Sequence, residues 1–366
     1  MRGLAFVQIR HTYEFVRVAC LLVWLSFHYG HAAVFPGERW ESVPASAVNM
    51  RAEGLLSARD YALTGAGSGY ITRHGKRVLA WGDPKKLYDL KSTTKSFGAA
   101  ALGLAIKDGK VRLSDKAKDL HPAFGTPPET NAQTGWLDQI TVLHLASQTA
   151  GFEKPGGYTP LLFPPGTKWD YSDSGPNWLA ECITLAYRRD LNDWMFERLF
   201  KPIGITSADL TWRKNSFRPH LIDGIPRREF GSGISANVDA MARFGYLFLR
   251  RGEWNGQQLL TAEYVDQVRV PVPASRNLPV VKPEEYSDAA THYGLLWWNN
   301  AGGSLKGVPR DAYWSWGLYD SLIVVIPSLD IVISRAGQSW KRQKGAHHYA
   351  VLKPFLEPIV QAVDMR

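Results

Sequence analysis

Cysteine is scarce in this 366-residue sequence, which contains only Cys20 and Cys182. Cys20 lies in an N-terminal segment that we expect to be removed, so the mature protein would keep one thiol and form no internal disulfide. Cys182 lies in the helical pattern of residues 178–183, where a free cysteine usually packs as a small apolar side chain. The cysteine content therefore excludes a disulfide-stapled scaffold.

Signatures of several other protein classes are also missing. The sequence has no H-E-x-x-H or C-x-x-C motif and its ten histidines are scattered, so it predicts neither a metal nor a cofactor. His144, on an apolar helical pattern, is predicted to be a core residue. The formal net charge is +9, but no basic block interleaved with aromatic residues indicates nucleic-acid binding. No serine occupies G-x-S-x-G, which excludes the nucleophile elbow of an α/β-hydrolase.

The apolar run at residues 18–25 is too short for a stable transmembrane helix. It follows three arginines and precedes small residues at 30–33, an order typical of a secretory signal peptide. We therefore expect residues 1–33 to be a signal peptide. Residues 34–366 would be exported, periplasmic or secreted, with no membrane span after cleavage. An uncleaved N-terminal anchor is the alternative, because the segment before the apolar run is long and contains Glu14.

Hydrophobic periodicity predicts one sheet assembled from the two ends of the chain. Residues 69–81 alternate around a turn, as in a β-hairpin, and residues 311–335 contain three strand patterns separated by turns. Residues 111–230 read as short helices and loops. We therefore expect an α+β fold with a mainly helical region, about residues 111–230, inserted into the part that holds the sheet. Further helices are predicted over residues 49–62, 236–252, 261–268 and 349–363, and from Ser92.

Ser92-Thr93-Thr94-Lys95 carries the most informative pair of side chains. Ser92 and Lys95 are three residues apart at the start of an apolar helical pattern, so they share one helix face and can touch. A serine hydroxyl becomes a nucleophile when a nearby base takes its proton. The spacing is common by chance, however, and alone it also fits an exposed helix start with a solvated lysine.

Tyr171 is the second candidate. It follows the Pro-Pro-Gly turn at residues 164–166, and such a turn presents the next segment in a fixed direction. A phenol can relay protons if a neighbouring ammonium lowers its pKa, and Lys95 could be that neighbour. A buried tyrosine with a hydrogen-bonded hydroxyl is the alternative interpretation.

The end of the predicted strand at residues 311–316 is the third candidate. Gly317 would let the backbone approach a ligand closely, and an N–H at the strand edge could stabilise an oxyanion. The other donor would be the N–H of Ser92, because a helix N-terminus favours negative charge. An ordinary strand-edge glycine also fits the pattern.

The ordered motifs S-x-x-K, Y-S-D and small-x-Gly resemble those of the serine β-lactamase-like superfamily. This group includes class C β-lactamases, D-alanyl-D-alanine carboxypeptidases and β-lactamase-fold carboxylesterases. The resemblance spans about residues 50–360 and implies a β-lactamase/transpeptidase-like fold, with an antiparallel sheet flanked by helices. It is also carried by the segments at residues 140–151, 163–166, 233–245 and 293–298.

The resemblance implies roles for the site residues. Ser92 would be acylated, Lys95 would help to deprotonate it, and Tyr171 would carry the proton to the leaving group and activate the deacylating water. The backbone N–H groups of Ser92 and Leu318 would form the oxyanion hole. Either Lys95 or Tyr171 could be the primary base, and the pair would titrate as a unit.

Two departures from the family pattern bear on the substrate. Asp173 stands where class C enzymes have Asn, and an ionised carboxylate only accepts hydrogen bonds. It would also hold Lys95 protonated if the two are close, which works against Lys95 as the resting base. Ser315-Trp316-Gly317 replaces the Lys-Thr-Gly that recognises the carboxylate of β-lactams and peptide termini. Losing that ammonium removes a contact of roughly 1.5–3 kcal/mol.

These features predict a small-molecule carboxylic ester or amide as the substrate, cleaved through an acyl-enzyme on Ser92 and contacted by Asp173 and residues 315–317. Two alternatives stay open. One is a β-lactamase or D-alanyl-D-alanine carboxypeptidase acting on cell-wall material, and the other is a catalytically weak ligand-binding protein on the same scaffold. An apolar or aromatic acyl or leaving group is suggested by four tryptophans, each of which also fits a packing role: Trp297, Trp298, Trp314 and Trp316.

Overall fold

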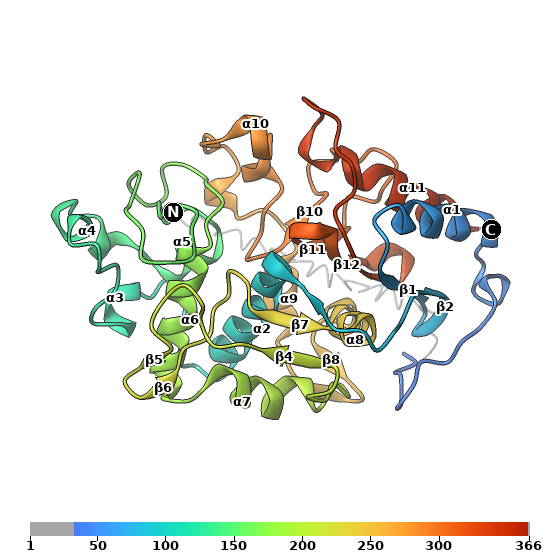
Figure 1. Ribbon diagram of the computed structural model, residues 1–366, viewed down its shortest axis with the longest axis horizontal. Coiled ribbons are helices and arrows are strands. Elements are labelled where there is room, and N and C mark those ends of the chain that lie inside the picture. Colours follow the sequence, from blue (N-terminus) through green and yellow to red (C-terminus); the bar gives the residue numbers. More distant parts are fainter. Residues whose placement is uncertain (1–32, 365–366) are drawn as a thin grey trace, which may run out of the picture. The chain divides into compact units, whose positions relative to one another are not determined.

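A six-stranded antiparallel sheet joins the two ends of the chain, in the order β10-β11-β12-β13-β1-β2 (Figure 1). The computed structural model describes residues 33–364, so the predicted signal peptide lies outside the described part except for Ala33. The prediction of an α+β fold with one sheet built from both ends is confirmed. The strands are β1 (Ser68–Arg73), β2 (Lys76–Trp81), β10 (Trp298–Asn299), β11 (Tyr313–Gly317), β12 (Ser321–Ile326) and β13 (Ile331–Ala336).

The central strands β12 and β13 are buried along their whole length, because helices cover both faces of the sheet. On one face, α8 (Val238–Leu249) packs so closely that a Cβ on its Gly245 would lie 2.7 Å from side-chain atoms of Ile323 and Val332. The other face packs against α1 (Ala52–Leu63) and α11 (Lys353–Gln361) through the alternate strand residues. The strands therefore read as nearly continuous apolar runs, since both sets of alternating side chains are inside.

The segment between β2 and β10 supplies most of the helices. Its central helix, α2 (Thr94–Lys107), is buried from Thr94 to Ala105 and lies between the sheet and α6 in Figure 1. The other helices are α3 (Ala117–Leu120), α4 (Thr130–Gln133), α5 (Val142–Ala146), α6 (Ser174–Tyr187), α7 (Leu191–Met195), α9 (Ala262–Val268) and α10 (Pro283–Tyr286). Short strands form a three-stranded sheet and two small hairpins: β3 (Tyr88–Asp89), β7 (Ile234–Ala236) and β4 (Leu210–Trp212); β5 (Leu221–Ile222) with β6 (Ile225–Pro226); β8 (Glu253–Trp254) with β9 (Gln257–Gln258).

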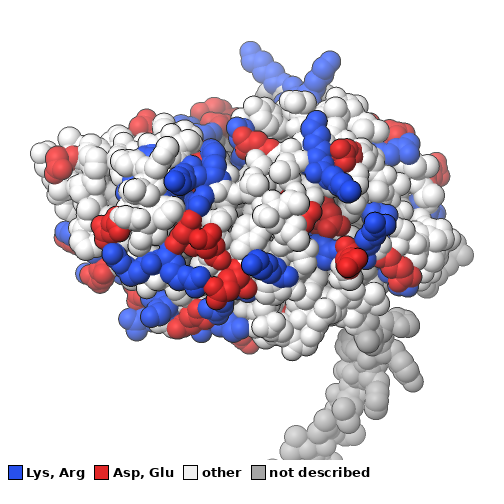
Figure 2. Space-filling model, turned by 60° about the horizontal axis from the view of Figure 1, so that its bottom comes forward, with Lys and Arg blue, Asp and Glu red and all other residues white. Residues whose placement is uncertain are grey.

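The predicted elements are present, with ends displaced by a few residues. The expected hairpin turn is a two-residue turn in which His74 and Gly75 both have positive φ, 54° and 74°, as the tightest hairpins require. Basic and acidic side chains are interspersed on the face drawn in Figure 2, despite the positive net charge. Among residues 33–364, no helix is both long and apolar enough to cross a bilayer.

Candidate active site

Ser92 and Lys95 lie at the entry to the buried helix α2. Ser92 sits in a 3-10 turn, η2 (Lys91–Thr93), and Lys95 in the first turn of α2 that follows. The Lys95 side chain is only 1% exposed, and its Nζ donates to Oγ of Ser92 at 3.1 Å. The structure thus contains the contact predicted from the three-residue spacing, and the solvated-lysine alternative is wrong.

The Lys95 ammonium has three acceptors. Besides Ser92, it forms an ion pair with the Asp173 carboxylate and donates to the carbonyl oxygen of Gly231 at 3.1 Å. An ammonium has three hydrogens and no lone pair, so all of its donors are used. Asp173 is thus a direct neighbour of Lys95, and its side chain is 25% exposed. In this arrangement Lys95 is a donor to the serine rather than an acceptor from it.

Tyr171 completes the group around Ser92. Nζ of Lys95 lies 4.6 Å from the centroid of the Tyr171 ring, and the Ser92 side chain is a neighbour of the phenol. Burial, followed by the negative charge of Asp173, raises the Tyr171 pKa well above its usual range, and the neighbouring Ser92 side chain opposes this only in part. The prediction that Lys95 lowers this pKa is therefore wrong. The reason is that the ammonium faces the ring and its charge is balanced by Asp173.

The end of β11 lies against the turn that carries Ser92. A Cβ on Gly317 would clash with the carbonyl oxygen of Leu90 and would lie 3.0 Å from the backbone nitrogen of Thr93. The φ of Gly317 is −110°, so glycine is needed here for close approach and not for an unusual backbone conformation. Leu318 follows and is 61% exposed. An oxyanion hole formed by the N–H groups of Ser92 and Leu318 stays a prediction, which this packing supports.

Ser315 and Trp316 use their polar atoms inside the protein. Oγ of Ser315 accepts a hydrogen bond from the backbone nitrogen of Ile323 at 2.9 Å, so this hydroxyl is occupied within the sheet. Nε1 of Trp316 donates to Asp320 at 2.9 Å. Any substrate contact at Ser315 would therefore come from the backbone, and no ammonium stands at this position of the strand.

All four tryptophans are buried in the core, and Trp298 and Trp316 keep small exposed fractions of 4% and 7%. Trp297 and Trp314 are completely buried and belong to the core, so the prediction that they help to define a substrate pocket is wrong. Trp298 stacks on Tyr171 with ring centroids 5.6 Å apart, and the ring centroids of Trp298 and Trp316 are 6.1 Å apart. The aromatic wall beside the catalytic candidates is thus formed by Tyr171, Trp298, Trp316, Tyr286 and His348.

Several residues near the site carry no signal in the sequence. The ring centroids of His348 and Trp316 are 4.5 Å apart, and those of Tyr286 and Tyr171 are 5.4 Å apart. Nζ of Lys154 donates to the Tyr286 hydroxyl at 2.7 Å and lies 5.8 Å from the Tyr171 ring centroid. These residues come from loops and short helices outside the recognised motifs, so only the packing of distant segments could identify them.

Cys182 is confirmed as a buried packing residue, whereas His144 is only half-buried and caps a helix instead of lying in the core. Cys182 is fully buried within α6, and burial raises the pKa of its thiol. His144 forms a capping box with Thr141 at the start of α5, and burial lowers its pKa. Neither side chain contacts Ser92 or Lys95.

Comparisons with known proteins identify the family and the fold of the chain. A model of the beta-lactamase family matches residues 61–352. A Bacteroides dorei protein assigned as a beta-lactamase superposes with a TM-score of 0.66 at 15% identity, covering 85% of this chain and 99% of that one. A penicillin-binding protein homologue from Caulobacter crescentus superposes with a TM-score of 0.64 at 16% identity, covering 85% of this chain and 98% of that one. A family VIII carboxylesterase superposes with a TM-score of 0.63 at 15% identity, covering 86% of this chain and 98% of that one. The chain therefore belongs to the beta-lactamase family and has its β-lactamase/transpeptidase-like fold.

Proposed function

We propose that the protein hydrolyses carboxylic esters or small amides through an acyl-enzyme on Ser92. The observation that carries this proposal is the contact at the serine, where the buried Lys95 ammonium donates to Oγ at 3.1 Å beside the Tyr171 phenol, whose ring centroid lies 4.6 Å from Nζ. A protein that only binds a ligand gains nothing from a nucleophile held in this way.

The donor and acceptor pattern gives the direction of proton transfer. Because Lys95 donates to Oγ, the hydrogen of Ser92 is left for another acceptor, and the neighbouring Tyr171 phenol is the group that we assign to receive it. As Oγ bonds to the substrate carbonyl carbon, its proton passes to Tyr171, while the phenol proton passes to the leaving oxygen or nitrogen. The relay needs no phenolate, which agrees with the raised pKa of Tyr171. Water then attacks the acyl-enzyme by the reverse route and frees Ser92.

Two features support esters or small amides over β-lactams. Ser315 stands at the strand position where related β-lactamases have the lysine that binds the substrate carboxylate. Its hydroxyl accepts from the backbone nitrogen of Ile323, so a substrate carboxylate meets no ammonium at this position. The partly exposed Asp173 carboxylate also repels an anionic substrate. A carboxylesterase among the structures of the same fold is consistent with this preference.

Labelling and turnover test the proposal together. We expect a fluorophosphonate probe to label the wild-type protein and not Ser92→Ala, since only the serine hydroxyl can bond to phosphorus. We also expect p-nitrophenyl acetate to be hydrolysed faster than a chromogenic cephalosporin. An unlabelled wild-type protein would contradict the hydrolase assignment, whereas faster cephalosporin turnover would contradict the substrate class and favour a β-lactamase.

We further propose that the protein is exported. The proposal rests on residues 1–33 of the sequence, with their arginines, short apolar run and small residues before residue 34. Expression of the full chain in a bacterial host, followed by N-terminal sequencing of the periplasmic fraction, is expected to give a mature start near residue 33 or 34. An intact Met1 on a cytosolic product would contradict export.

A further inference from the structure

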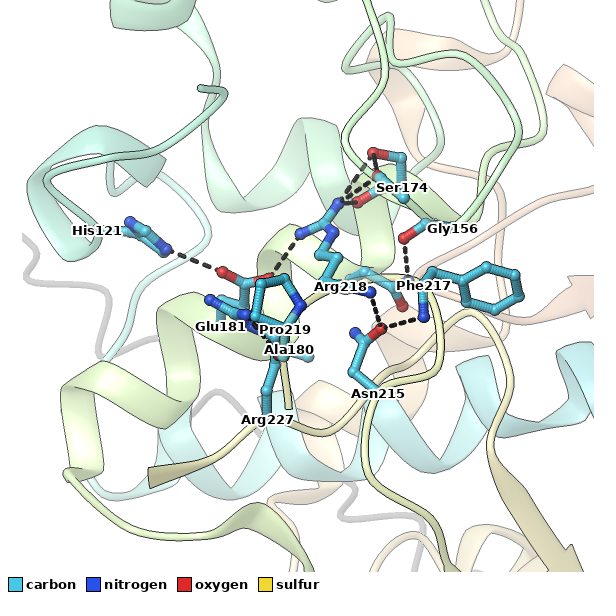
Figure 3. Close-up of polar contacts among 12 residues, drawn as sticks. His121, Gly156, Ser174, Ala180, Glu181, Asn215, Phe217, Arg218, Pro219 and Arg227 are labelled. Atoms are coloured by element: carbon cyan, nitrogen blue, oxygen red, sulfur yellow. Dashed lines mark hydrogen bonds and ion pairs between the residues drawn. The ribbon is translucent and has the colours of Figure 1, made fainter. Parts of the chain in front are cut away.

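A buried charged cluster lies beside α6, outside the contacts of Ser92 (Figure 3). Its centre is Glu181, a residue of α6 that is 1% exposed. Oε1 of Glu181 accepts from Arg218 at 2.7 Å, and Oε2 pairs with His121 at 3.0 Å. Arg227 lies 3.2 Å from the same carboxylate. Such a cluster is costly to bury, and none of its groups contacts Ser92 or Lys95, so its position needs an explanation.

Arg218 connects this cluster to the first residue of α6. Its side chain is completely buried, and Nη2 donates to the carbonyl oxygen of Ser174 at 3.1 Å, to Oγ of Ser174 at 3.0 Å and to the carbonyl oxygen of Gly157 at 3.0 Å. Ser174 begins α6, and Glu181 is about two turns further along the same helix. One guanidinium therefore joins the start of α6 to its own second turn and to the neighbouring loop.

The residue before Ser174 is Asp173, the anionic partner of Lys95. The backbone nitrogen of Asp173 donates to the carbonyl oxygen of Lys154 at 2.8 Å, in the same loop that Arg218 holds through Gly157. Arg218 binds the next residue, so the backbone of Asp173 is fixed on both sides. Its carboxylate then reaches Lys95, which in turn donates to Ser92.

We propose that Arg218, held by Glu181, is a positioning residue that fixes Asp173 against Lys95 and thereby sets the geometry of Ser92. The proposal rests on the function proposed above and adds a residue to its machinery. A planar guanidinium suits the role because it can bind a carboxylate through one nitrogen and a set of neighbouring oxygens through another, which an ammonium cannot do in the same geometry. Displacement of a catalytic group by about 1 Å can slow a reaction by about a hundredfold.

The test is the second-order rate constant of fluorophosphonate labelling in Arg218→Lys, which keeps the charge and loses the planar fork. We expect this rate constant to fall by about tenfold to a hundredfold while the final extent of labelling stays complete. A purely structural role would lower the extent, because part of the protein would be unfolded, and would leave the rate constant of the folded fraction unchanged.

Arg243→Lys is the matched control. Arg243 is also buried, pairs with the carboxylate of Asp239 at 2.7 Å and donates to three carbonyl oxygens, those of Ile203, Gly37 and Glu38. None of these contacts involves Lys95, Asp173 or Gly231. We expect the control to lose thermal stability as Arg218→Lys does, and to be labelled within about twofold of the wild-type rate.

A double-mutant comparison shows whether Arg218 acts through Asp173. If it does, Arg218→Lys has little further effect in an Asp173→Ala background, because the contact that Arg218 supports is already lost there. Full additivity of the two effects, or wild-type labelling of Arg218→Lys, would overturn the proposal. If Arg218→Lys does not fold, Ser174→Ala removes only the hydroxyl that Arg218 binds, and an unchanged labelling rate in that variant would overturn it instead. Unlabelled wild-type protein would refute the hydrolase function, a separate outcome.

Discussion

Replacement of Tyr171 by Phe is the sharpest test of the proton relay, because it removes one oxygen and keeps the ring. The side chain is 6% exposed and packs against Trp298, Tyr286 and Trp169, contacts that a phenylalanine ring retains. The loss in stability should therefore be limited to the polar contact of one hydroxyl, about 1 kcal/mol. Proton transfer by a positioned group contributes about 10²–10⁴-fold to a rate. We expect kcat for p-nitrophenyl acetate to fall within that range while KM changes little.

A comparison of the wild type with Tyr171→Phe also tests how kcat/KM depends on pH. Burial and Asp173 raise the Tyr171 pKa above its usual value of 10, so the phenol keeps its proton throughout the neutral range. The pH profile of kcat/KM should therefore show no limb that Tyr171→Phe abolishes between pH 6 and pH 9. A base that worked as phenolate would produce such a limb.

Tyr264→Phe is the control for loss of a buried hydroxyl. Tyr264 is 2% exposed and donates to the carbonyl oxygen of Ala99 at 2.6 Å, without contact to Ser92 or Lys95. We expect this variant to lose stability by a similar amount and to keep kcat. If Tyr171→Phe keeps its kcat as well, or if both variants lose activity equally, the relay through Tyr171 is refuted.

Two further predictions concern stability. Burial, with the positive charge of Arg342, lowers the pKa of His348 from 6.5 to about 4. Between these two pH values the unfolded chain binds a proton at His348 and the folded protein does not. As the pH falls from about 6.5 to about 4, the free energy of unfolding should therefore decrease by about 3 kcal/mol through this group. His348→Phe should show a shallower loss in urea unfolding over that range, and equal slopes would refute the assignment. Gly317→Ala should lose about 1–3 kcal/mol and slow fluorophosphonate labelling, because its Cβ would press on the turn that carries Ser92. Gly37→Ala, whose Cβ would meet nothing within 4 Å, should change neither, and a Gly317→Ala protein with normal melting and labelling would show that the close approach is unimportant.

The strands of the sheet were largely predictable because each one corresponds to a local pattern of apolar residues in the sequence. The strand β12, Ser321–Ile326, lies within the stretch of residues 311–335 for which the sequence predicts three strands, since apolar runs between turn residues specify strands locally. Helix ends were less well placed. The helix predicted over residues 349–363 is a 3-10 segment, His348–Leu352, followed by α11, because Pro354 and the neighbouring packing decide where the regular helix begins.

The sequence by itself determined the contact between Ser92 and Lys95. Side chains three residues apart on a helix face the same way, whatever surrounds them. Only the tertiary structure decided what the lysine does there. Its other acceptors, Asp173 and Gly231, lie 78 and 136 residues further along the chain, and no local rule brings them to the same ammonium. The packing of distant segments also sets the burial that raises the pKa of Tyr171, because burial is a property of neighbours that the sequence does not place.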